Sequence, residues 1–357
     1  MTDFLATTLN TDVSNTIKTY YDRVLLETME SELRFHQFAD KKPVPKGEGT
    51  SVKWNIVKNF DMGRILTEGQ AGTVSAGRNL STLAVSAIVQ QYGDWCPVSD
   101  VAQAASIMDV GKQAVERLAY QMAKTIERVT ANAIVNGVST AGQNVQHWFK
   151  TSTEFTKYYG MTSTISAGIM TVSATNIMAV SDIKDAVYQL KKQGVKPYDG
   201  KDYIGILPTE VAANIAGDST FIGFHQYVEK GVDNLYNGEL GKVYGCRLVD
   251  APEGPVKRGS NAGGTASTMA YGSIIMGKGF YGAVEFFGEG MSTHMVKGAT
   301  KSDPLDQFSI YGWKANYAAK ALNPSAGLVL WTGARETTEA YAESANSGLR
   351  HEDPSSY

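Results

Sequence analysis

A long run of helical periodicity between residues 98 and 137 constrains the fold more than any other feature of this sequence. Apolar side chains recur there on two neighbouring helical stripes. Their positions are Val101, Met108, Val115, Met122, Val129, Ala104, Leu118, Ile126 and Ala133. Asp109 and Gly111 indicate a break, and Asn136 with Gly137 is a stop signal. The pattern predicts a short helix and then a long one over about 109–136, which would extend roughly 40 Å and form the spine of the molecule.

A glycine-rich segment separates two expected strands on the N-terminal side of this helix. Apolar and polar side chains alternate over residues 52–56, the two-residue period of a half-exposed strand, and a second strand is expected within 80–93. Residues 61–79 between them are rich in Gly, Ser and Thr. Because a two-stranded ribbon is only marginally stable in water, we expect this one to pack against another molecule. The candidate contact residues at its tip are Arg64, Ile65, Leu66 and Glu68.

The second half of the chain has the pattern of an α/β lobe. Helical patterns at 181–194 and 209–217 flank an apolar strand at 203–208. The sequence then becomes β-rich and contains a flexible loop at 258–268. Further strands are expected at 241–252, 270–276, 282–287 and 327–334.

The two ends of the chain and one central segment differ from this lobe. Amphipathic spacing predicts an N-terminal helix over about 16–38, which Pro43 and Pro45 end. Residues 137–175 give no firm pattern. The polar segment 335–357 has few residues able to bury apolar area, so we expect a disordered tail.

Composition and charge argue against several classes of function. No secretory signal is recognisable, and no stretch approaches the roughly 18 consecutive apolar residues of a membrane helix. The 33 basic and 36 acidic residues are mixed along the chain, so no basic field is available to grip nucleic acid. Cys96 and Cys246 form no disulfide pattern and are expected to be small buried hydrophobes. These features predict a cytosolic chain that contacts no membrane and at most touches DNA weakly.

Motifs for catalysis or ligand binding are weak. GKGFYG, residues 277–282, has the glycine spacing of a dinucleotide-binding turn, but AVEFFGEG follows where a helix should begin. A β-hairpin turn or bulge is therefore favoured over a nucleotide-binding enzyme, which remains the alternative from another class. The histidines lack a nearby second metal ligand; they are His36, His147, His225, His294 and His351. We predict a non-enzymatic protein with no catalytic, cofactor-binding or metal-ligating residues.

The order of these parts resembles the major capsid proteins of tailed bacteriophages. The likeness covers roughly residues 15–332 and is strongest with a podophage-type branch. It rests on three segments: PKGEGTSVKW with the later LTEG, YGDWCPVSD, and DPLDQFSIYGWKANYAAKALNP. These proteins share the Johnson fold with herpesvirus capsids and encapsulin compartments, so the resemblance implies an α+β chain of that fold.

The resemblance also implies a division of the chain into named segments. These are an N-terminal arm (1–45), an extended β-hairpin E-loop (46–97), a P-domain with the spine helix (98–175), an α/β A-domain (176–302), return strands of the P-domain (303–334) and the tail (335–357). Asp303 and Pro304 would end the A-domain, and the aromatic run after them would be a strand beneath the spine helix. In that strand alternate residues share a face, so Tyr311, Trp313 and Tyr317 should pack on the helix.

The function implied is that of a shell protein in the virion, assembled in the cytoplasm of a bacterial host. Copies would form hexamers and pentamers of an icosahedral head that holds double-stranded DNA, with E-loops and N-terminal arms clasping neighbours. A portal protein and a separate scaffolding protein are expected partners, since no charged helical scaffolding segment precedes the arm; a decoration protein is left open. The runner-up is an encapsulin-like compartment that encloses a cargo enzyme.

Overall fold

The computed structural model of the chain describes most of the segments between residues 33 and 334. The described residues are 33–43, 51–57, 60, 79–137, 144–151, 154–159, 172–173, 175–226, 239–260, 267–284, 291–296, 305 and 307–334. The tail at 335–357, the ribbon tip with Arg64, Ile65, Leu66 and Glu68, and most of the expected N-terminal helix lie outside them. Residues 36–38 of that expected helix form a 3-10 turn, η1 (His36–Phe38), instead of α-helix.

The spine helix is present where its periodicity predicts it. A short helix, α2 (Asp100–Ala105), precedes the long helix α3 (Val110–Val135). The Asp109 carboxylate caps α3 by accepting a hydrogen bond from the Lys112 N–H at 3.1 Å, and Asn136 ends it. One face of α3 is buried, including Met122 and Ile126, so burial of this stripe fixes how the helix lies on the rest of the chain.

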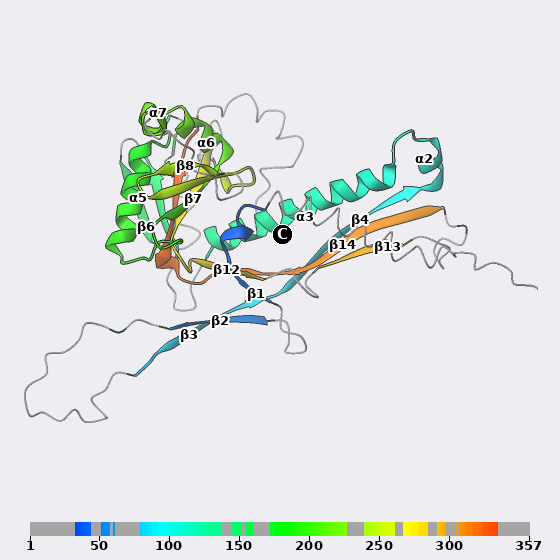
Figure 1. Ribbon diagram of the computed structural model, residues 1–357, viewed down its shortest axis with the longest axis horizontal. Coiled ribbons are helices and arrows are strands. Elements are labelled where there is room, and N and C mark those ends of the chain that lie inside the picture. Colours follow the sequence, from blue (N-terminus) through cyan, green and yellow to red (C-terminus); the bar gives the residue numbers. More distant parts are fainter. Residues whose placement is uncertain are drawn as a thin grey trace, which may run out of the picture.

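A three-stranded antiparallel sheet runs alongside the spine. Its order is β13 (Met291–Val296), β14 (Phe308–Tyr317) and β4 (Gln90–Ser99). Burial along β14 alternates as predicted, with the face of Tyr311, Trp313 and Tyr317 buried. Figure 1 shows α3 lying along this sheet, with α2 at its far end. The 303–323 segment therefore contributes the long central strand of this layer.

The expected ribbon is present, with one correction. Strand β2 (Ser51–Val57) pairs with β3 (Thr82–Ile88), and Val52 and Trp54 are buried as the alternation predicts. The single strand expected within 80–93 is wrong, because the strand is interrupted at Val89 and the pairing partner changes from β2 to β14. Continuous apolar alternation does not record a change of partner, so the sequence alone gave no sign of this interruption.

The lobe is built on an eight-stranded sheet. Its order is β6 (Phe155–Tyr159), β5 (Gln146–Lys150), β16 (Gly327–Thr332), β11 (Ser267–Met276), β7 (Tyr203–Pro208), β9 (Cys246–Ala251) and β8 (Glu239–Val243), with β10 (Val256–Ser260) paired to β11. Its helices are α5 (Val180–Lys192), α6 (Thr209–Ala216) and α7 (Ser219–Gln226). The expected helices and the strand at 203–208 are thus confirmed.

Three details of the lobe differ from the sequence expectations. The strand expected at 241–252 is two strands, β8 and β9, joined by a tight turn in which Tyr244 and Gly245 have φ of 50° and 77°. The ends of the expected loop at 258–268 belong to β10 and β11. The sheet also contains β5, β6 and β16, which the expected boundaries at 175/176 and 302/303 assign to the other domain. The expected boundaries divide the chain into consecutive segments. The sheet, however, is formed by strands that are distant in the sequence, since β16 pairs with both β5 and β11.

A small sheet joins the lobe to the spine. Its order is β1 (Asp40–Lys42), β12 (Tyr281–Val284) and β15 (Ala319–Ala321), and a second 3-10 turn, η3 (Pro324–Ala326), follows it. The GKGFYG segment is the turn between β11 and β12, with Gly279 at φ 74°. A strand follows it, which confirms that it does not open a dinucleotide-binding helix. It is not a hairpin turn, because β11 and β12 belong to different sheets.

Candidate functional site

The aromatic face of β14 lies buried next to the spine helix. Tyr317 is fully buried, and its hydroxyl lies 2.6 Å from Thr130 Oγ1 on α3. The Tyr311 hydroxyl accepts a hydrogen bond from Gln103 Nε2 at 3.4 Å and also reaches Gly111, where an added Cβ would lie only 2.6 Å from it. Trp313 is 4% exposed. The helix can approach this face closely because residue 111 has no side chain.

A short N-terminal segment, residues 33–42, is docked against both elements. The Glu127 carboxylate on α3 accepts hydrogen bonds from the N–H of Phe35, at 3.0 and 2.9 Å, and from the N–H of His36, at 3.3 Å. The Tyr281 hydroxyl donates to the Phe35 carbonyl. Glu127 thereby caps the first N–H groups of η1, which has no capping side chain of its own. Sequence reasoning missed Glu127, because its partners lie 91 and 92 residues away.

Burial shifts the protonation of the two titratable groups at this contact in opposite directions. Desolvation raises the pKa of Glu127 to about 7, although hydrogen bonds from backbone N–H groups and the charge of Arg34 act to lower it. Desolvation, helped by the charge of Lys41, lowers the pKa of His36 to about 3. The His36 Nδ1 lies 3.3 Å from the Tyr317 hydroxyl. A neutral imidazole therefore occupies this site at neutral pH.

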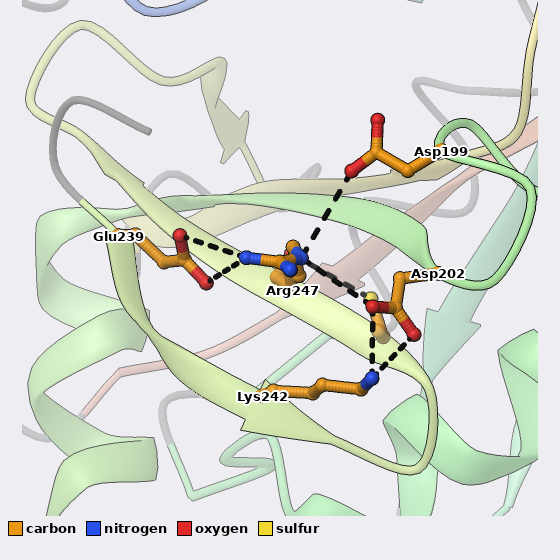
Figure 2. Close-up of polar contacts among 6 residues, drawn as sticks. Asp199, Asp202, Glu239, Lys242 and Arg247 are labelled. Atoms are coloured by element: carbon orange, nitrogen blue, oxygen red, sulfur yellow. Dashed lines mark hydrogen bonds and ion pairs between the residues drawn. The ribbon is translucent and has the colours of Figure 1, made fainter. Parts of the chain in front are cut away.

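A network of charged side chains joins β8, β9 and the loop before β7. Figure 2 shows Arg247 between three carboxylates, with its Nη1 3.1 Å from Glu239 and its Nε 3.4 Å from Asp202 and 3.9 Å from Asp199. Lys242 Nζ lies 2.7 Å from Asp202. Because Asp202 and Glu239 are nearly inaccessible to solvent, these contacts have to satisfy their charge. The network fixes the β8–β9 hairpin on the lobe.

Most of the exposed large apolar side chains of the described residues lie outside the lobe, although Tyr188, Ile222, Leu240 and Tyr244 lie on it. Ten of them lie on the ribbon, the three-stranded sheet and the ends of α2 and α3. These ten are Val57, Phe60, Leu80, Ile88, Trp95, Val101, Ile107, Met108, Leu305 and Phe308. Trp95 is 67% exposed, and Ile107 is fully exposed. The exposed apolar side chains of the ribbon and the three-stranded sheet are candidate contacts with other macromolecules.

Within the described residues the structure offers little for catalysis. They contain no cluster of His, Cys, Asp and Glu side chains arranged to hold a metal ion. Cys246 is fully buried, and burial raises the pKa of its thiol, so it is unreactive; Cys96 is half-buried. The buried His147 accepts a hydrogen bond from Trp331 Nε1 at 3.0 Å, a packing role. No helix in the described ranges is long and apolar enough to cross a membrane.

Comparisons with known proteins agree with this architecture. The phage capsid protein family matches residues 82–330. Curated protein sequences give no match. Among solved structures, the capsid of Ralstonia phage GP4 is similar, with a TM-score of 0.64 and 12% identity over 87% of this chain and 92% of that chain. The capsid of cyanophage P-SCSP1u gives a TM-score of 0.56 and 16% identity over 85% of this chain and 88% of that chain.

An encapsulin shares the fold less closely. The SrpI encapsulin complex from Synechococcus elongatus PCC 7942 gives a TM-score of 0.50 and 12% identity over 85% of this chain and 89% of that chain. These similarities establish the Johnson fold, and the family match extends over more than half of the sequence. The chain therefore belongs to the phage capsid protein family and is a major capsid protein, a shell component of the virion that assembles with copies of itself.

Proposed function

We propose that this capsid protein builds an icosahedral head from hexamers and pentamers, with the β2–β3 ribbon as an E-loop that clasps the neighbouring copy. The supporting observation is that the ribbon exposes Val57 and Ile88 and the three-stranded sheet exposes Trp95 and Phe308, although these side chains are apolar. In this assignment α3 with the three-stranded sheet is the P-domain, and the lobe with α5 and α6 is the A-domain. The protein has no enzymatic activity of its own.

The partners of this shell follow from the same proposal. A portal protein and a separate scaffolding protein act with it during assembly, and the packaged double-stranded DNA is contacted weakly because the chain carries a formal charge of −3. The family match and the phage capsid structures favour a DNA-containing head over an encapsulin-like compartment. Shells purified with one enclosed enzyme and no DNA would reverse this choice.

The ribbon tip provides the direct test. In the variant I65S/L66S the length of the tip is kept and its apolar pair is removed. We expect native circular dichroism and melting, because the change leaves the described core intact, but failure to close shells in electron microscopy and elution as subunits or small capsomers on a sizing column. The matched control T67S/Q70S should assemble normally. Normal shells from I65S/L66S would refute the role of the tip.

A further inference from the structure

Docking of the N-terminal segment, residues 33–42, buries one acid and one base side by side. Glu127 is 2% exposed and receives the N–H groups of Phe35 and His36. The His36 ring is 5% exposed and lies 5.9 Å from the Tyr317 ring, centroid to centroid. The segment carries His36 itself and covers Glu127, so both groups lose water as a consequence of docking.

Several charged side chains surround Glu127. Within the described residues Glu127 forms no ion pair, and the nearby Arg34 has Nε and Nη1 buried without a hydrogen-bond partner. On the same helix, Lys124 and Arg128 are paired with Glu253 at 3.4 and 2.9 Å. A cavity of about 20 Å³ beside Glu127 is large enough for one water molecule, and it is lined by Arg34, Lys124, Glu127 and Glu253 among others.

Other titratable groups near the segment change charge outside the mildly acidic to neutral range or carry smaller shifts. Burial raises the pKa of the Tyr281 and Tyr317 hydroxyls, so both stay neutral. Partial burial raises the pKa of Asp40, and the charge of Lys278 opposes this rise. Among the described groups near the segment, Glu127 and His36 therefore have the largest pKa shifts between mildly acidic and neutral pH, and the rise at Asp40 adds to the proton uptake at Glu127.

The two couplings have opposite signs. The pKa of Glu127 is raised from 4.5 to about 7, so docking takes up a proton there between those values and is favoured as the pH falls. The pKa of His36 is lowered from 6.5 to about 3, so docking releases a proton there and is disfavoured as the pH falls. The two pH windows overlap between 4.5 and 6.5.

We propose that Glu127 and His36 act as a compensating pair that keeps the N-terminal segment docked at nearly constant strength from mildly acidic to neutral pH. The proton that Glu127 binds on docking replaces the proton that His36 loses. By proton linkage, His36 alone would weaken docking about 30-fold between pH 8 and pH 5, and Glu127 alone would strengthen it about 70-fold. Together the two effects largely cancel, so the net change is smaller than either group alone would give.

Hydrogen exchange of the Phe35 and His36 amides in the full-length protein reports this docking directly, because both amides donate to Glu127. Protection factors, corrected for intrinsic exchange, should change less than about tenfold between pH 8 and pH 5 in the wild type. In E127Q the protection factors should fall about 30-fold from pH 8 to pH 5, and in H36N they should rise about 70-fold over the same range. The amides of β7 provide the internal reference within each sample.

The variant H294N provides the matched control, since it removes a histidine of β13 and leaves the segment intact; its profile should match the wild type. A wild-type change of tenfold or more, or flat profiles in both E127Q and H36N, would overturn the proposal. If circular dichroism shows that E127Q does not fold, H36N decides alone. An unchanged flat profile in H36N would then refute the compensation.

Discussion

Gly111 lies near the start of the spine helix and contacts Tyr311. The effect of the substitution G111A on the free energy of unfolding should therefore depend on the Tyr311 hydroxyl. A Cβ at Gly111 would lie 2.6 Å from the Tyr311 hydroxyl and 3.1 Å from the ring carbon that carries it. The Tyr311 ring is 4% exposed, so it has little room to move aside. Overpacking of this kind costs about 1–3 kcal/mol, whereas replacing glycine by alanine in a helix gains about 1 kcal/mol.

We therefore expect G111A to lower the free energy of unfolding by up to about 2 kcal/mol in the wild-type background. In the Y311F background, the same change should cost about 1 kcal/mol less, because the 2.6 Å contact disappears and only the ring carbon at 3.1 Å remains close. Y311F alone should cost about 0.5–1.5 kcal/mol through the hydrogen bond with Gln103.

Chemical denaturation of the unassembled subunit, followed by circular dichroism, measures all four corners of this double-mutant cycle. The matched control background is Y120F, which removes a hydroxyl from a side chain on α3 that is 47% exposed; G111A should have its wild-type effect there. A coupling energy near zero between positions 111 and 311 would show that the aromatic face does not set the distance between sheet and spine.

Three further predictions concern other parts of the chain. W95S should change subunit stability by less than about 0.5 kcal/mol but lower the yield of shells in electron microscopy, whereas Y188S on α5 should not; equal yields would contradict this. K150M should destabilise the lobe by about 3–5 kcal/mol in denaturant titration, because it leaves the Asp182 carboxylate buried without its cation 2.5 Å away, and K150M/D182N should recover part of the loss. A chain ending at Ala334, which is buried, should keep its melting temperature; a drop of many degrees would mean that residues 335–357 contribute to stability.

Local patterns of the sequence predicted those elements whose burial follows their own period. The stripe containing Val115, Leu118 and Met122 predicted α3, and the alternation in β14 predicted which face is buried. GKGFYG was interpreted correctly as a turn and not the start of a helix, because an aromatic β-type sequence follows it, but the expected hairpin was wrong, since β11 and β12 belong to different sheets. In each case the signal and the structure lie in the same short window.

Features that depend on distant partners could not be predicted in this way. The parallel pairing of β5 with β16 joins segments about 180 residues apart, and the sequence of neither strand indicates which strand it pairs with. The contact of Glu127 with Phe35 is similar, since a glutamate at this position of a helix is also consistent with a solvent-exposed face. The turn at Tyr244 was missed because only one glycine marks it.

Residues that stabilise the folded subunit and residues available for assembly lie in different parts of the molecule. The eight-stranded sheet belongs to the first group. Alternate residues of β7 enter different cores: Ile206 packs in the cluster that includes α3, and Leu207 in the cluster beneath α5 and α6. Because the sheet is buried on both faces, its central strands β7 and β16 are continuously apolar. One of these faces packs in the same cluster as α3, so the spine and the lobe have a common core. Trp95, by contrast, is an exposed residue of β4 in the three-stranded sheet. Substitutions at Ile206 should therefore change the free energy of folding, whereas substitutions at Trp95 should change the free energy of association.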